Sequence, residues 1–174
     1  METQTVEAPR PVNRFLKEAQ DFMGGVQPDR VIIGMASGYS SGQWRQDIQI
    51  LDFGPDLKRK GFNENLPPHS GSQTDWNDTK AYLEGIGVTD KKAQVLHEDY
   101  QWGNAEYGKN YITARLSELH SGLRSVRDLR QELETVTETD ERDRITDDIA
   151  GIEQSKQGIL ASLQKAGYKL PFEV

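Results

Sequence analysis

The chain has 174 residues, of which 34% are hydrophobic, and its 28 acids against 21 bases give a formal net charge of −7. This length suffices for one domain, or for a small domain with a helical appendage. The acidic balance disfavours nonspecific binding to nucleic acid or anionic lipid, and the absence of cysteine excludes disulfides and thiolate metal sites. The lean apolar content favours a protein that gains stability by assembly with itself or with a larger partner.

The N-terminal residues 1–12 are polar and include two prolines, so we expect a flexible arm there. This stretch lacks the apolar run of a signal peptide, and no segment reaches the roughly 18 continuous apolar residues of a membrane span. The sequence therefore predicts a cytoplasmic or virion protein that is not secreted and does not contact a membrane.

The first regular elements are a short helix and a β-hairpin. Asn13 can cap a helix that carries one apolar stripe and ends at Gly24-Gly25. The β-branched run in 30–39 and the alternating pattern in 44–53 each predict a strand, with a turn at 40–42 between them.

A long stretch rich in turn formers, residues 54–72, follows the second strand. We expect an irregular loop there and place a boundary at its end, between a β-hairpin body at 13–72 and a helical region at 73–174. The helical region should begin with a helix that is capped by Asp75 or Asn77 and ends at Gly85. A second short helix should begin at Thr89 or Asp90.

The C-terminal third, residues 104–167, has the most regular pattern in the chain. Its apolar residues follow the a/d spacing of a helical hairpin or short coiled coil. They are Leu116, Leu119, Leu123, Val126 and Leu133 in the first arm, and Ile145, Ile149, Ile152, Ile159 and Leu163 in the second. The interval between Val136 and Ile145 has no apolar residue, so we place the turn at 135–140. One unbroken helix is the alternative.

The net charge is concentrated around this expected turn. Between Glu132 and Glu153 there are nine acids and two bases, whereas the rest of the chain is neutral. Such a cluster is costly to bury, so we expect the end of the hairpin to project into water. Glu138, Asp140, Glu141 and Asp143 would then form an acidic tip that can meet a basic partner.

Residues 83–93 contain a Gly-hydrophobic-Gly turn followed by two lysines. Gly85-Ile86-Gly87 with Lys91 and Lys92 resembles part of the helix-hairpin-helix family of DNA-binding motifs. In that family the turn amides bind a phosphate. The resemblance covers about a dozen residues, and Ala93 lies six positions after Gly87, where the family places a small residue about four after it. A plain turn between two short helices is the alternative.

Few other residues suggest chemistry. Gly38-Tyr39-Ser40-Ser41-Gly42 has the G-x-S-x-G pattern of a nucleophile elbow, but a β-like segment follows where the motif needs a helix, so we favour a hairpin turn. The three histidines, His69, His97 and His120, lack metal-ligand spacing. We expect no metal, no cofactor and no enzymatic activity, with a serine hydrolase at Ser40 as the enzyme alternative.

The fold class predicted from these patterns is α+β and mainly helical, with a small β-hairpin body and a C-terminal antiparallel, coiled-coil-like helical hairpin. We expect a structural or interaction subunit that forms an oligomer or joins a larger particle, such as a phage virion. Its partner-binding residues would be Leu116, Leu119, Leu123, Val126, Ile149, Ile152 and Ile159, together with the acidic tip. An acidic inhibitor that mimics nucleic acid, and a DNA-binding module at Gly85 and Gly87, are the alternatives.

Overall fold

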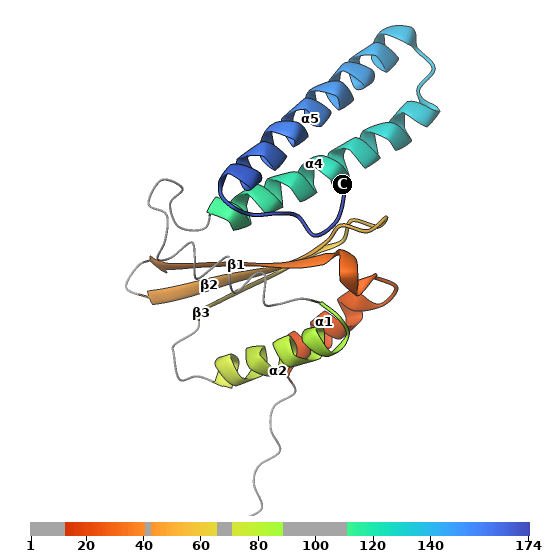
Figure 1. Cartoon of the computed structure of the whole chain (residues 1–174). Coiled ribbons are helices and arrows are strands. Elements are labelled where there is room, and N and C mark those ends of the chain that lie inside the picture. Colours follow the sequence, from red (N-terminus) through yellow and green to blue (C-terminus); the bar gives the residue numbers. More distant parts are fainter. Residues whose placement is uncertain (1–12, 41–42, 66–70, 89–110) are drawn as a thin grey trace, which may run out of the picture.

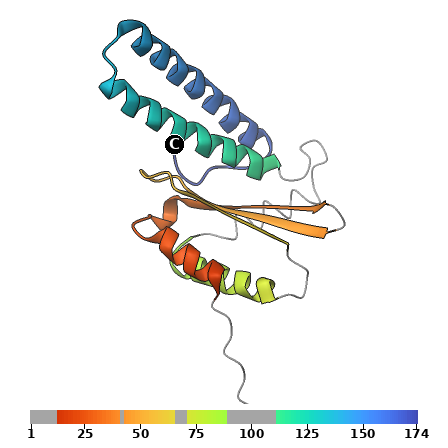
Figure 2. The same cartoon turned by 180° about the vertical axis from the view of Figure 1, so that it is seen from behind.

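The structure is a computed structural model that describes residues 13–40, 43–65, 71–88 and 111–174. Three layers lie one above another in two opposite views (Figures 1 and 2). A sheet occupies the middle, two helices cover one face and a helical hairpin covers the other. The elements are α1 (Arg14–Met23), η1 (Pro28–Arg30), β1 (Val31–Ser40), β2 (Gln43–Asp52), β3 (Arg59–Asn65), α2 (Gly71–Gly85), α4 (Tyr111–Thr135) and α5 (Thr139–Lys165).

The predicted fold class is confirmed, because helices and one antiparallel sheet make up the described chain and α4 packs against α5 as a hairpin. A single unbroken helix is excluded, since α4 ends at Thr135 and α5 begins at Thr139. The expected arm at 1–12 and the short helix expected from Thr89 or Asp90 lie outside the described residues. The division into two regions at residue 72 stays a prediction.

Helix α1 begins and ends where its sequence predicts. The Asn13 side chain accepts a hydrogen bond from the Leu16 amide at 3.1 Å, which is the usual N-cap interaction. At the other end the Gly24 amide donates to the Asp21 carbonyl at 3.4 Å. The buried side chains Phe15, Ala19 and Met23 lie on the apolar stripe and face the sheet core.

The sheet has the order β1-β2-β3, with antiparallel neighbours, and both its faces are covered. Ile33 pairs with Ile50 on one face, and Ile32 pairs with Leu51 on the other. Because successive strand residues point to opposite faces, the first pair packs with α1 and α2 and the second with the hairpin. The sheet therefore contributes one face to each of two separate apolar clusters.

Strand β3 corrects the expectation of an irregular loop at 54–72. Residues 59–65 pair with β2, from Leu51 opposite Arg59 to Arg45 opposite Asn65. The strand is polar because it lies at an edge of the sheet, where charged residues are common. The turn before it is held by Asp52, whose carboxylate accepts the Gly54 amide at 2.7 Å. Helix α2 also begins earlier than expected, at Gly71.

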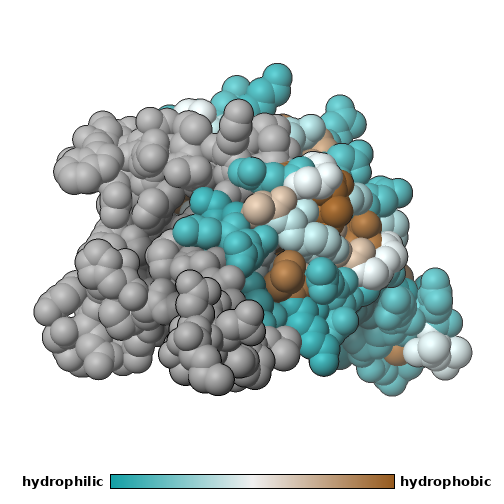
Figure 3. Space-filling model, turned by 90° about the horizontal axis from the view of Figure 1, so that it is seen from below, coloured by the Kyte–Doolittle hydropathy of each residue, from teal (hydrophilic) through white to brown (hydrophobic). Residues whose placement is uncertain are grey.

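The α1–α2 layer can be viewed from outside in Figure 3, from below the orientation of Figure 1. On the described part of this face, apolar side chains occur in small groups between hydrophilic ones (Figure 3). Small groups of this kind are ordinary on a protein surface.

Candidate functional site

The base of the hairpin belongs to the protein core. Leu116 and Leu119 of α4 are each 1% exposed, and Leu163 of α5 is 2% exposed. All three pack in one cluster with Ile32 and Leu51 of the sheet. Val126, one of the predicted partner-binding residues, is also buried. Leu116 and Leu119 are therefore enclosed within this chain and do not form part of an exposed binding surface, whereas Val126 borders a groove described below.

The C-terminal segment strengthens the attachment of the hairpin to the sheet. After α5, the Gly167 amide donates to the Gln164 carbonyl and the Tyr168 amide donates to the Leu163 carbonyl, at 3.0 and 2.9 Å. This pattern is a Schellman motif, and Gly167 supplies the positive φ of 87° that it requires. Downstream, the Phe172 ring lies 5.3 Å from that of Phe53. Leu170 and Val174 pack against the same cluster, so the apolar tail lies on the fold.

One buried polar side chain links the hairpin to the sheet. His120 of α4 is fully buried, with its Nε2 3.0 Å from the Asp52 carbonyl oxygen and its ring edge-on to Phe53. Because a carbonyl only accepts, Nε2 carries the proton. Burial is the main cause that lowers the pKa of His120 below 6.5; the hydrogen bond to Asp52 opposes it, and the charge of Arg124 lowers the pKa further.

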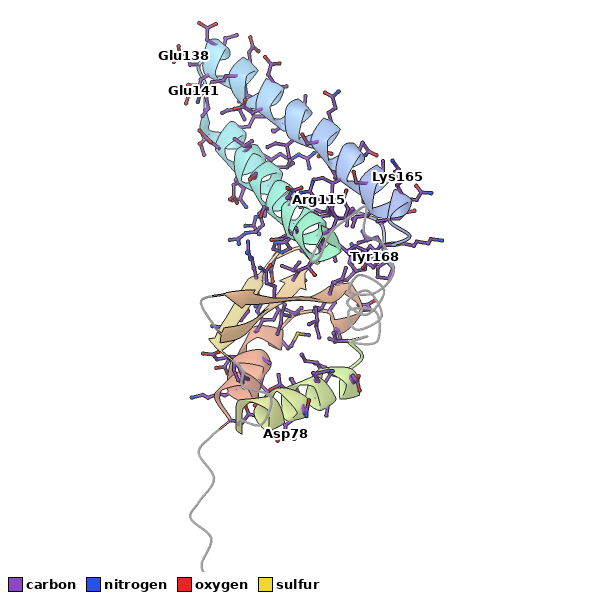
Figure 4. All side chains as sticks on the ribbon, turned by 90° about the vertical axis from the view of Figure 1, so that its left-hand side faces the viewer. Asp78, Arg115, Glu138, Glu141, Lys165 and Tyr168 are labelled. Atoms are coloured by element: carbon purple, nitrogen blue, oxygen red, sulfur yellow. The ribbon has the colours of Figure 1, made fainter. Side chains whose placement is uncertain are left out.

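The distal half of the hairpin extends away from the sheet (Figure 1). Glu138 and Glu141 lie at its far end, whereas Tyr168 lies near its base (Figure 4). Along this half, Leu129, Ile149 and Ile152 are only half-buried. A pair of helices without a third layer cannot cover both sides of the seam between them. The apolar side chains of the distal α4–α5 seam therefore remain partly in contact with solvent.

Two grooves lie on opposite faces of the hairpin. On α4, one groove is lined by residues at 123, 126, 127, 130, 131 and 134, and the other by residues at 125, 128 and 129. With 3.6 residues per turn, these two sets point in opposite directions from the helix axis. The hairpin therefore presents two different surfaces.

The first groove, here called the basic groove, has a volume of about 770 Å³ and lies between the hairpin and the turn after β2. Its cations are Arg30, Arg127, Arg130 and Lys156, and its acids are Glu134 and Glu153. All four of these cations already have partners in the chain. Glu153 pairs with Arg130 at 3.5 Å and with Lys156 at 2.7 Å, Arg127 donates to the Asp56 carbonyl, and Arg30 lies 4.8 Å from the Phe172 ring centre.

The second groove, here called the acidic groove, has a volume of about 590 Å³. It is lined by Ser125, Asp128 and Leu129 of α4 and by Asp147, Asp148, Gly151, Ile152 and Ser155 of α5. No base lines it, and of its three acids only Asp128 has an ion-pair partner among the described residues, at 3.2 Å from Arg127. Half-buried apolar groups thus lie beside carboxylates that are free to pair.

The turn at the tip of the hairpin is held in a fixed shape. Arg142 reaches back from α5 and donates to the carbonyls of Leu133 and Val136 at 2.7 and 2.6 Å. Ile145 beneath it is 1% exposed. The predicted tip acids lie on the outside: Glu138, Asp140 and Asp143 are exposed and Glu141 is half-buried. Acids in the first turn of α5 also favour the helix through its dipole.

The Gly85–Gly87 turn is a second Schellman motif. The Gly87 amide donates to the Glu84 carbonyl and the Val88 amide to the Leu83 carbonyl, at 3.1 and 2.9 Å. The Ile86 amide donates to Tyr82. All three amides are therefore used by the end of α2 and none of them is free for a phosphate. Lys91 and Lys92 lie outside the described residues.

In the part of the chain that the structure describes, the other candidate residues do not form a reactive cluster. Ser40 ends β1, and β2 follows it at Gln43, so the strand–turn–helix context of a nucleophile elbow is not formed. His69 and His97 lie outside the described residues. Within the described ranges, no group of three or more His, Cys, Asp or Glu side chains could hold a metal ion.

The sequence alone did not identify the residues that line the acidic groove, apart from Ile152. Ser125, Asp128, Asp147, Asp148 and Gly151 lie beside the apolar seam, and their types are common on any solvated helix. One signal was present in the sequence: Gly151 and Ser155 lie one turn apart inside a helix, although both residue types are poor helix formers.

Comparisons with models of known protein families, with curated proteins and with solved structures gave no match. None of the helices in the described part of the chain is long and apolar enough to cross a membrane.

Proposed function

We propose that this protein is a non-enzymatic interaction subunit that joins a larger assembly, such as a phage virion, through its C-terminal helical hairpin. The observation that supports this proposal is the half-burial of Leu129, Ile149 and Ile152 on a hairpin whose far half stands clear of the body. Apolar side chains in such a position gain stability when another protein surface covers them.

The first test is the mass of the purified protein. Sedimentation velocity over a wide concentration range separates the two forms of the proposal: self-assembly gives species heavier than the 19.7 kDa chain, which Ile149→Gln shifts toward one chain, whereas docking on a different protein gives one chain. A single-chain mass at every concentration would exclude self-assembly and leave only docking on a different protein. A single-chain mass, together with no binding of either a basic or an acidic amphipathic helical peptide, would contradict the proposal itself.

A second candidate function is that of an acidic inhibitor, in which the tip occupies a basic surface that normally binds nucleic acid. The braced turn supports this alternative, because it presents Glu138, Asp140 and Asp143 to solvent in a fixed arrangement. Binding through the tip should weaken with added salt and with Asp140→Asn/Asp143→Asn. An affinity that salt leaves unchanged would exclude the tip as the binding determinant.

The remaining alternatives have direct tests. DNA binding through the turn at Gly85 predicts retention on DNA at low salt that is lost in Lys91→Ala/Lys92→Ala, and no retention of the wild type would exclude it. A serine hydrolase at Ser40 predicts labelling by a fluorophosphonate probe that Ser40→Ala abolishes.

A further inference from the structure

The two grooves of the hairpin differ in whether other groups of this chain bridge or border them. On the side of the basic groove, Arg130 of α4 pairs with Glu153 of α5, and Lys156 lies against the same carboxylate with its side chain only 17% exposed. The tail and the turn after β2 also border that groove. On the side of the acidic groove, no ion pair between α4 and α5 occurs among the described residues. Leu129 and Ile152 are therefore left uncovered on that side.

Small residues of α5, Gly151 and Ser155, line the acidic groove. Gly151 lies in the interior of α5, where glycine is among the least favourable residues. A Cβ added at this position would meet no atom within 4 Å, so the fold of this chain does not require a glycine there. Gly122 is different, because a Cβ added to it would lie 3.5 Å from Ile152. Gly151 and Ser155 keep the groove open for the backbone of another element.

The charge of the acidic groove restricts what can cover it. Asp147 and Asp148 have no ion-pair partner within the described ranges, and Asp128 has only its neighbour Arg127. Nucleic acid and anionic lipid would be repelled by these carboxylates. The best complement is a convex apolar ridge flanked by cations, which is what a basic amphipathic helix presents.

Within the described residues, no helix of a second copy supplies that complement. None of the described helices has more basic than acidic residues. A symmetric contact would place the same aspartates opposite each other. The basic groove of a second copy has suitable charges but is itself concave, and two concave surfaces cannot fill each other.

We infer that the acidic groove binds a basic amphipathic helix from a different protein, which completes a three-helix arrangement with α4 and α5. This inference depends on the proposed function and adds the chemistry of the partner. Leu129 and Ile152 would contact the apolar ridge of the bound helix, Gly151 and Ser155 would allow its backbone to approach, and Asp128, Asp147 and Asp148 would pair with its lysines or arginines.

The probe is a labelled helical peptide of about 18 residues, or five turns, with leucine and alanine on one face and lysines along both edges of that face. Its counterpart has glutamate at every lysine position. Fluorescence anisotropy with the full-length protein should give an affinity for the lysine peptide at least about tenfold higher than for the glutamate peptide. That preference should shrink between about 50 mM and about 500 mM salt.

Two pairs of variants locate the binding surface. Gly151→Gln adds a side chain in the groove, at a position where the new Cβ meets no atom within 4 Å, and should weaken binding of the lysine peptide about tenfold. Ala150→Gln adds the same side chain at the preceding residue, which is exposed and lines neither groove. It should leave the affinity for the lysine peptide unchanged. Asp147→Asn/Asp148→Asn should weaken binding about fivefold, whereas Asp140→Asn/Asp143→Asn at the tip removes the same charge and should have little effect. Thermal unfolding confirms that each variant is folded.

Several results would overturn the assignment of the groove. Equal affinity for the two peptides, an unchanged affinity in Gly151→Gln, or a larger loss from the tip pair than from Asp147→Asn/Asp148→Asn would each do so. Binding that is lost only in the tip pair would keep the proposed interaction function and assign it to the tip. No binding of either peptide, combined with a single-chain mass in sedimentation, would remove both the groove and the proposed function.

Discussion

His120 predicts that the attachment between the hairpin and the sheet weakens in mild acid. In the native state its imidazole is fully buried, and burial lowers its pKa below 6.5. The unfolded chain therefore binds a proton more readily than the folded chain as the pH falls through 6.5. It follows that the contribution of His120 to stability is fully present above this pH and is lost below it.

The size of this effect is bounded by the number of protons involved. One histidine can change the free energy of unfolding by at most about 1.4 kcal/mol per pH unit, and only below the unfolded pKa of about 6.5. A fall from about pH 7.5 to about pH 5.5 therefore lowers the free energy of unfolding by at most about 1.4 kcal/mol. Urea unfolding followed by circular dichroism, at several pH values across this interval, measures the slope. The control is His120→Gln, whose amide nitrogen can still donate to the Asp52 carbonyl but does not titrate.

Subtracting the variant from the wild type removes the contribution of the carboxylates, which both proteins share. We expect the wild type to lose stability faster than His120→Gln below pH 6.5. Parallel curves would show that His120 does not titrate differently in the two states. In that case burial would not restrict its protonation, and the reasoning would fail.

Three further substitutions test the packing and the caps by urea unfolding. Leu119→Ala should cost about 2–5 kcal/mol because Leu119 is 1% exposed between the hairpin and the sheet. Asn13→Ala should cost about 1 kcal/mol through loss of the hydrogen bond to the Leu16 amide. Gly167→Ala should cost about 1 kcal/mol because φ is +87°, whereas Gly158→Ala, in the open interior of α5, should add roughly 0.5–1 kcal/mol. Equal effects at the two glycines would contradict the assigned Schellman motif.

Local chemistry made much of the fold predictable. The side chain of Asn13, the Gly24-Gly25 pair and the loss of apolar spacing after Val136 each mark an end of a helix, and the structure places ends there. The hairpin turn was located correctly, although its threonines do not cap α5: Thr135 donates to the Glu132 carbonyl at the end of α4, and Glu138 occupies the N-cap position.

Strand β3 could not be predicted because its stability comes from its neighbour. Its sequence, RKGFNEN, has one apolar side chain and no alternation, so nothing local distinguishes it from a loop. Its backbone is held by hydrogen bonds to β2, which the sequence does not reveal. The same limit applies to the two faces of β2, since the roles of Ile50 and Leu51 depend on which layer covers each face.

The candidate site could be predicted only in part, because the same heptad pattern occurs in residues that pack against the sheet and in residues that stay partly exposed. Leu116 and Ile152 occupy equivalent seam positions, yet Leu116 is enclosed by the sheet and Ile152 is only half-buried. The periodicity is identical in both cases. What separates them is where the body of the protein ends beneath the hairpin, and this depends on contacts far apart in the sequence.

The asymmetry of the distal hairpin gives the strongest reason to look for a partner on one particular side. A seam between two helices has two open flanks, and the pair between Arg130 and Glu153 crosses one of them. The other flank has Leu129 and Ile152 partly exposed, with a helix-weakening glycine between acids that lack partners across the groove. If these residues were only the solvent-exposed surface of an arm that binds nothing, Gly151→Gln would stabilise the helix and have no other effect. The peptide measurements separate that outcome from loss of binding, because the stabilising effect is expected in either case.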